Sequence, residues 1–129
     1  MRLLLDTHTL FWALTRPARL GEQARPLLED PANIVLASPV NALEMALKHR
    51  LGKMDQAGPV LDAYESHLTE MGIEELPITT AHALLAGSMR WDHRDPFDRL
   101  LAAQAMIDHV TLVTDDSQLK TLPGLATVW

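Results

Sequence analysis

Four acidic residues lie beside apolar segments, where a charged side chain is costly unless a partner compensates it. They are Asp6, Glu44, Asp98 and Asp116. Glu44 is the sharpest case, because apolar residues recur around it at helical spacing and its carboxylate is therefore predicted to face the core. That stripe consists of Val40, Leu43, Leu47 and Leu51. The four acids together predict a divalent-metal site.

All the candidate ligands are oxygen donors. The chain has no cysteine, and its 6 histidines show no spacing typical of zinc sites, so most of them are expected at the surface or at helix ends. Hard oxygen ligands favour Mg²⁺ or Mn²⁺ over Zn²⁺. His8 is the one histidine expected near the site, since it follows Asp6 by two residues.

Strand and helix signals alternate along the whole chain. Strands are expected at residues 3–5, 34–36, 73–76, 110–113 and 126–128. Helices are expected at residues 7–14, 22–29, 38–51, 59–71 and 79–89, and a last one begins at Asp95-Pro96. Ser38 is predicted to cap the third helix and Gly52 to end it. No linker or repeat interrupts this pattern, which predicts one domain over residues 1–129.

Such alternation predicts an α/β fold, a three-layer sandwich in which helices flank a mostly parallel sheet of about five strands. In the strand order 3-2-1-4-5, the first and fourth strands are neighbours, and Asp6 and Asp116 meet at their carboxyl ends. Ligands of these sheets bind where the strand order reverses. The helices that carry Glu44 and Asp98 would complete a ring of oxygen ligands at this point.

Two of the acids also have an explanation as helix caps. Asp6 is suited to cap the helix that follows it, because its side chain can accept a hydrogen bond from a free backbone N–H. Asp115 or Asp116 is suited in the same way to cap a short turn over residues 117–120. Capping therefore stays open beside metal binding.

The other two acids have structural alternatives as well. Asp98 fits an ordinary helix start, in which Asp95 is the cap and Pro96 occupies the first turn. Glu44 can pair with Lys48 one helical turn later. A single metal site nevertheless accounts for all four acids at once, whereas these alternatives require four coincidences.

Composition limits the classes of function. A net charge of -6 excludes a surface that coats nucleic acid by charge alone, so an RNA substrate would depend on bound cations and local basic clusters. The lack of cysteine excludes a disulfide framework and favours the cytoplasm. The apolar run at the N-terminus is too short for a signal peptide or a membrane span.

Four segments resemble the motifs of a known family. They are residues 3–12 (LLLDTHTLFW), 41–48 (NALEMALK), 93–105 (HRDPFDRLLAAQA) and 112–116 (LVTDD). In this order they look like PIN-domain proteins, specifically the VapC-type toxins of bacterial toxin-antitoxin pairs. The similarity covers nearly the whole chain, and the run from Arg94 to Ala105 is its most specific part. The PIN-like sandwich agrees with the strand order argued above.

The resemblance implies a Mg²⁺-dependent ribonuclease that hydrolyses RNA phosphodiester bonds, is neutralised by a cognate antitoxin and forms a homodimer. Leu10, Leu14 and the helix at 59–71 are expected to supply apolar surface for that dimer. The four acids match the family's catalytic, metal-binding residues. Supporting roles are expected for Thr7, His8, Asn41, Asp95, Thr114 and Asp115, and phosphate contacts for Lys48, Arg94 and Arg99.

The chain departs from the family pattern in two places. Asn41 and Leu43 stand where close relatives usually have Ser and Trp, although Asn41 can still donate a hydrogen bond into the site. The usual Thr-Ala-Asp motif becomes Thr114-Asp115-Asp116, which adds an acid. We assign the ligand role to Asp116 by register.

Two other classes of protein remain as alternatives. A haloacid-dehalogenase-type phosphatase also carries an Asp-x-Asp-x-Thr motif after a strand, but His8 replaces the second Asp here. A non-catalytic PIN-like domain could keep the acidic pocket only to bind a basic partner peptide. A Mg²⁺ titration coupled to an RNA cleavage assay separates these alternatives.

Overall fold

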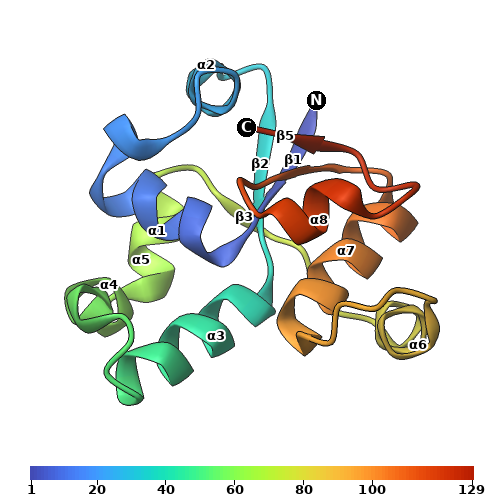
Figure 1. Cartoon of the computed structure of the whole chain (residues 1–129). Helices are drawn as coiled ribbons and strands as arrows, with labels where there is room; N and C mark the ends of the chain where they lie inside the picture. The colour runs from blue at the N-terminus through green and yellow to red at the C-terminus, as the bar shows by residue number, and fades with distance from the viewer.

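The computed structural model describes all residues 1–129, and its five strands form one parallel sheet (Figure 1). The strands are β1 (Arg2–Leu5), β2 (Ile34–Ala37), β3 (Glu74–Glu75), β4 (Thr111–Val113) and β5 (Thr127–Val128). Their order is β3-β2-β1-β4-β5, and every neighbouring pair is parallel. The predicted order 3-2-1-4-5 is confirmed, and the sheet is wholly parallel.

Eight α-helices and two short 3-10 helices connect the strands. The α-helices are α1 (Thr7–Thr15), α2 (Ala24–Glu29), α3 (Pro39–Arg50), α4 (Gly58–Asp62), α5 (Tyr64–Glu70), α6 (Thr80–Ser88), α7 (Pro96–Asp108) and α8 (Ser117–Thr121). The 3-10 helices are η1 (Pro17–Arg19) and η2 (Asp55–Ala57). The longest helix, α7, has 13 residues, and no helix combines the length and apolar character needed to cross a bilayer.

The two faces of the sheet bury two separate apolar clusters, because side chains alternate along each strand. Leu3 and Leu5 point into the cluster covered by α1 to α5, while Leu4 points into the cluster covered by α7 and α8. Helix α6 packs against α7 on the outer side (Figure 1). This arrangement is the predicted three-layer sandwich.

The single helix expected at 59–71 is wrong. The chain breaks at Ala63, whose φ of -139° and ψ of 40° leave the helical region, and forms α4 and α5 instead. Both pieces bury an apolar side chain in the same cluster, Val60 from α4 and Leu68 from α5. The apolar pattern therefore does not distinguish one helix from two. The turn expected at 117–120 is also more regular than predicted and forms α8.

Candidate active site

Asp6 lies between the end of β1 and the start of α1, and its side chain contacts residues of both regions. Its Oδ1 accepts a hydrogen bond from the backbone N–H of Thr9 at 2.7 Å, so it caps α1. Its Oδ2 accepts a hydrogen bond from the hydroxyl of Thr114, which follows the neighbouring strand β4. The side chain is buried. One carboxylate thus caps α1 and also lies at the carboxyl end of the sheet, as both interpretations of the sequence predicted.

The side chain of Glu44 on α3 points inward as predicted, but the buried face of the helix includes only part of the predicted apolar stripe. The buried residues of this helix are Val40, Asn41, Glu44 and Met45. Leu43 and Leu51, expected in the core, are 57% and 52% exposed. The predicted burial of these two leucines is therefore wrong, although Glu44 itself is buried, with 4% of its surface exposed. The predicted helix bounds hold, since Ser38 caps the start and Gly52 follows the end with a φ of 74°.

The buried carboxylate of Glu44 has two partners. The Thr7 hydroxyl donates a hydrogen bond to Oε1, and the ammonium of Lys48 lies 2.7 Å from Oε2. The sequence offered two interpretations of Glu44, an ion pair with Lys48 and a carboxylate that faces the core, and the structure shows both. Because Lys48 is partly exposed, its ammonium can leave Glu44 without crossing the core.

Asn41 connects α3 to the end of β1. Its Oδ1 accepts the backbone N–H of Ser38 at 2.7 Å, which completes a capping box. Its Nδ2 donates to the carbonyl of Leu5 and to the hydroxyl of Thr7, both at 3.2 Å. Asn41 is fully buried. Asn41, which is larger than the Ser usual at this position, therefore binds Thr7, and Thr7 in turn binds Glu44.

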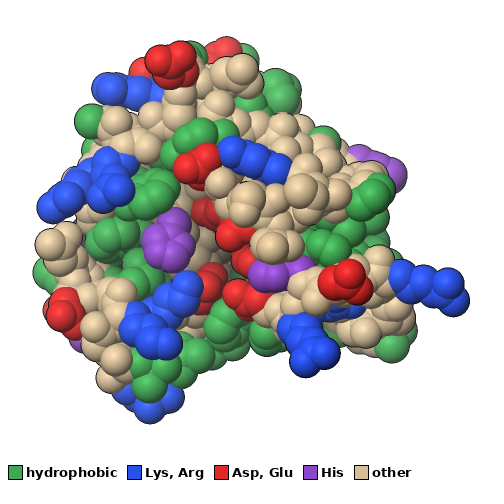
Figure 2. All heavy atoms as spheres, viewed as in Figure 1, with side chains coloured by type: hydrophobic (Ala, Val, Ile, Leu, Met, Phe, Trp, Pro, Cys, Tyr) green, Lys and Arg blue, Asp and Glu red, His purple; other side chains and the backbone are tan.

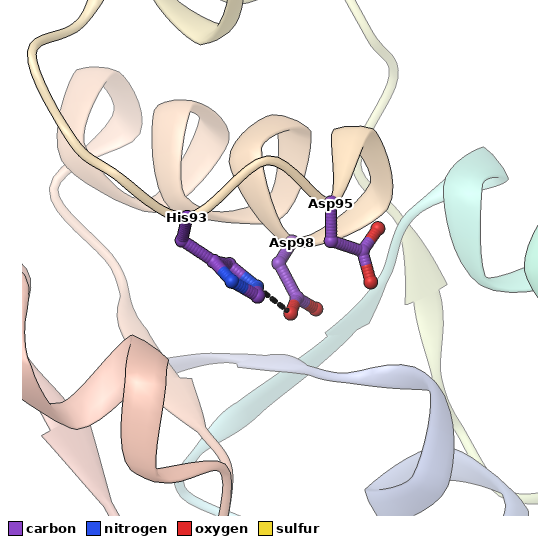
Figure 3. A group of neighbouring side chains, drawn as sticks. All are labelled: His93, Asp95 and Asp98. Carbon is purple, nitrogen blue, oxygen red and sulfur yellow. Dashed lines mark hydrogen bonds and ion pairs between the residues drawn. The ribbon is translucent and has the colours of Figure 1, made fainter.

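Asp98 lies in the first turn of α7, next to His93, a histidine for which the sequence predicted no role in the site. Asp95 caps this helix through the N–H of Phe97, as the structural alternative proposed. His93 Nε2 lies 2.6 Å from Asp98 Oδ2 (Figure 3). The ligand atoms of His93, Asp95 and Asp98 all lie within 4.8 Å of one another. His93 is thus the site residue that sequence reasoning missed, although it stands in the most specific motif.

Asp115 and Asp116 follow β4 and have different partners. Asp116 caps α8 by accepting the N–H groups of Gln118 and Leu119 at 2.8 and 3.1 Å. Asp115 forms an exposed ion pair with Lys120, with 2.8 Å between Nζ and Oδ1. Asp116 lines the same cavity as Asp6, Glu44 and Asp98, and its charge raises the pKa of Asp98.

These carboxylates surround one cavity of about 400 Å³ at the carboxyl end of the sheet. The cavity is lined by the four acids and by Thr7, His8, Trp12, Lys48, Asp95 and Asp115. Acidic side chains fill the hollow on this face, with histidine and basic side chains around it (Figure 2). Trp12 is the one hydrophobic residue that lines it. The predicted convergence of Asp6, Glu44, Asp98 and Asp116 is therefore present in the structure.

The electrostatics of the cavity suit a cation. Burial raises the pKa of Asp6, and burial followed by the charges of Asp95, Asp116 and Glu44 raises the pKa of Asp98 to about 6. The hydrogen bond from His93 opposes the shift at Asp98. Clustered carboxylates resist ionising together, and a hard divalent ion removes that cost by binding their oxygens. All the possible donors are carboxylates except the imidazole of His93, which lies beside Asp95 and Asp98, and such a set fits a hard divalent ion.

The basic residues expected to contact phosphate differ in position. Lys48 lines the cavity, and Arg94 is exposed on the segment before α7. Arg99 does not line the cavity, and its guanidinium donates to four backbone carbonyls instead. The geometry gives no support to a phosphate contact by Arg99, because its donors are already used within the protein.

Comparison with known proteins identifies the family. A model of the PIN domain matches residues 3–125. This chain belongs to the PIN-domain family. Ribonuclease VapC22 of Mycobacterium tuberculosis is 30% identical to it over 98% of this chain and 97% of that protein. PIN-domain ribonucleases generally depend on a divalent metal, and the acidic cavity agrees with that property.

Two solved structures share the PIN fold. VapBC2 from Rickettsia felis, bound to a DNA fragment from its promoter, gives a TM-score of 0.67 at 18% identity over 99% of this chain and 98% of that chain. DNA-bound VapBC from Salmonella typhimurium gives 0.68 at 16% identity over 99% and 97%. The PIN-domain assignment removes the haloacid-dehalogenase alternative.

Proposed function

We propose that this chain is a divalent-metal-dependent ribonuclease toxin that hydrolyses RNA phosphodiester bonds and is neutralised by a cognate antitoxin. The observation that carries this proposal is the convergence of four acids, from β1, α3, α7 and the end of β4, on one cavity of a PIN domain. The similarity to ribonuclease VapC22, over nearly all of both chains, supports the same activity.

In this proposal, Asp6, Glu44, Asp98 and Asp116 hold the ion. Mg²⁺ is the preferred ion and Mn²⁺ a substitute, because every donor of this set is a carboxylate oxygen. When bound, such an ion activates water and stabilises negative charge on the phosphate oxygens. Asp116 takes this role rather than Asp115, because the carboxylate of Asp115 is paired with Lys120.

The remaining residues of the cavity orient these acids and receive the substrate. Thr7, held by Asn41, fixes one oxygen of Glu44, and Thr114 fixes one oxygen of Asp6. Lys48, released from Glu44 when a cation takes its place, becomes free to contact a phosphate. Arg94 extends the positive rim towards the RNA, and His8 adds an exposed imidazole beside Trp12, with 5.8 Å between the ring centroids.

The partners follow from the same site. An antitoxin is expected to insert a basic side chain among the acids in place of the cation, so raised Mg²⁺ should weaken its binding. The structural neighbours from two bacteria, both VapBC assemblies, support a partner of this kind. We further propose that residues 1–129 form one domain that acts in the cytoplasm.

We also propose a homodimer, although only part of the apolar surface predicted for it is exposed. Leu10 is fully buried and therefore not free for a partner, and Leu14 is partly buried against the same cluster. Large apolar side chains remain exposed elsewhere. They include Leu43, Leu51, Met71 and Leu84.

The decisive experiment is cleavage of RNA by the purified chain. We expect cleavage with Mg²⁺ or Mn²⁺, none with excess EDTA, and none with Ca²⁺ alone. Double-stranded DNA serves as the control substrate. A chain that binds Mg²⁺ but leaves a mixed pool of cellular RNA intact, with every acid in place, would favour the non-catalytic alternative.

A further inference from the structure

The guanidinium group of Arg99 binds four backbone carbonyl oxygens, one in the last turn of α6 and three in the segment that joins α6 to α7. Nε donates to the carbonyl of Ala86 at 2.7 Å, and Nη2 donates to that of Met89 at 2.5 Å. Nη1 donates to the carbonyls of Trp91 and His93 at 2.8 and 2.9 Å. Of the five N–H donors that a guanidinium offers, these bonds use four.

The side chains of Met89 and Trp91 pack against the apolar cluster under α7, but the backbone of this segment has few hydrogen bonds other than those to Arg99. Residues 89–95 form no helix or strand, and no backbone-to-backbone hydrogen bond involves residues 90–93. Arg99 also lies over the ring of Trp91, 5.9 Å from its centroid, and the rings of Trp91 and His93 are 4.9 Å apart between centroids. The path of the backbone here therefore depends on Arg99.

The same segment delivers His93 to the candidate active site. His93 points its imidazole at Asp98, the residue that directly precedes Arg99 in α7 (Figure 3). Two adjacent residues of one helix thus hold one loop, Arg99 through the backbone carbonyls and Asp98 through the imidazole. A shift of the loop would move the imidazole away from the carboxylate.

We infer that Arg99 is a positioning residue for the proposed ribonuclease reaction: by fixing the 86–93 backbone, it holds His93 against Asp98 and so sets the orientation of that carboxylate. This inference rests on the proposed function only for its effect on cleavage. Lysine cannot replace Arg99 in this role, because a single ammonium cannot reach carbonyls that are spread around a planar fork of donors. The role differs from a phosphate contact, in which the guanidinium would face the substrate.

The first test compares Arg99→Lys with His93→Gln by nuclear magnetic resonance of the histidine side chains. The signal that disappears in His93→Gln identifies His93. In Arg99→Lys we expect that signal to move to the position of a solvent-exposed histidine, while the signals of His8 and His49 stay in place. Arg90→Lys, an exposed neighbour on the same segment, is the control and should leave the His93 signal unchanged. An unchanged His93 signal in Arg99→Lys overturns the inference.

The second test is a double-mutant cycle on the binding of Mn²⁺ alone, measured by calorimetry. Loss of the partner that orients a metal-binding carboxylate typically weakens metal binding by about tenfold or more. Arg99→Lys and His93→Gln should each produce that loss, and the double variant should bind about as well as either single variant. Multiplicative losses would mean that Arg99 acts independently of His93 and would overturn the inference. In cleavage assays, kcat should fall in Arg99→Lys with KM nearly unchanged, whereas loss of a phosphate contact would raise KM.

A third measurement covers the case in which Arg99→Lys does not fold. In the wild-type chain, hydrogen exchange of the Arg99 Nε–H and of the His93 ring N–H is followed in urea below the unfolding midpoint. Both protons should lose protection at the same urea concentration. Separate losses overturn the inference. Neither this measurement nor the histidine signals require cleavage, so a failed ribonuclease assay would refute the proposed function without deciding the role of Arg99.

Discussion

The hydroxyl of Thr114 donates a hydrogen bond to Oδ2 of Asp6, and this bond joins two residues 108 positions apart in the chain. It ties the carboxyl end of β4 to that of β1, the two strands on either side of the point where strand order reverses. The Thr114 oxygen also accepts the N–H of Asp116 at 3.0 Å. One hydroxyl thus places two of the four acids relative to each other.

Asp6→Asn should abolish RNA cleavage and leave the fold intact. The amide oxygen can still accept the Thr9 N–H, so the cap of α1 is kept, while one charge leaves a crowded acidic cavity. We expect the free energy of unfolding to be unchanged or raised by up to about 1 kcal/mol. Cleavage assays and urea denaturation in EDTA check both parts. Full activity of the purified Asn variant would remove Asp6 from the site.

Asn41→Ala should destabilise the chain by about 2 to 3 kcal/mol, since it removes the buried acceptor of the Ser38 N–H and the buried donor to the Leu5 carbonyl and to Thr7. Asn41→Ser should lose less, because a serine hydroxyl can still complete the capping box. Urea denaturation measures both variants. Equal stability of the Ala variant and the wild type would show that water replaces the amide.

Lys48→Met should make the stability of the chain depend more strongly on Mg²⁺, because Glu44 loses the cation that pairs with it. Without the ammonium, the buried carboxylate loses its charged partner, and we expect the metal-free chain to lose on the order of 2 kcal/mol. Added Mg²⁺ should then raise the melting temperature more than it does in the wild type, because binding restores the missing charge. Lys120→Met, which breaks an exposed pair, is the control and should change stability little. A Mg²⁺ effect identical in Lys48→Met and wild type would contradict this prediction.

The stability of the metal-free chain should fall as pH rises through the titration of Asp98. Its pKa in the folded chain is raised to about 6, so between about pH 4 and pH 6 the folded chain keeps a proton that the unfolded chain has released. The folded state therefore loses stability across this window and stays less stable above it. Asp98→Asn cannot ionise, so at pH 7.5 it should exceed the wild type by on the order of 2 kcal/mol and come close to it near pH 4. Urea denaturation in EDTA at the two pH values checks this, and an equal difference at both would contradict it.

Sequence reasoning succeeded where residues obey local rules. The alternation of strand and helix signals predicted the order of the sheet, and the acids at Asp6 and Asp116 followed from strand ends alone. Ser38 and Gly52 predicted the bounds of α3 because caps depend on neighbouring backbone groups.

The missed features depend on contacts between distant segments. His93 seemed unremarkable because only the fold of the loop, held by Arg99, brings its ring to Asp98. The burial of Leu43 and Leu51 was wrongly predicted, because periodicity does not show which residues of a helix are covered by other parts of the fold. Arg99 was expected at a phosphate for the same reason, since its carbonyl partners have no signature in the sequence.

The pairing of β1 with β4 also bears on the moment at which the enzyme becomes dangerous to the cell that makes it. A ribosome that has not yet delivered β4 holds a nascent chain with Asp6, Glu44 and Asp98 already synthesised but without Thr114 and Asp116 to close the cavity. Because the proposed metal site then lacks Asp116, we expect such a chain to be unable to cut RNA. A message broken upstream of the Thr114 codon would likewise yield an inert product. We therefore expect RNA cleavage only from chains whose synthesis has passed β4.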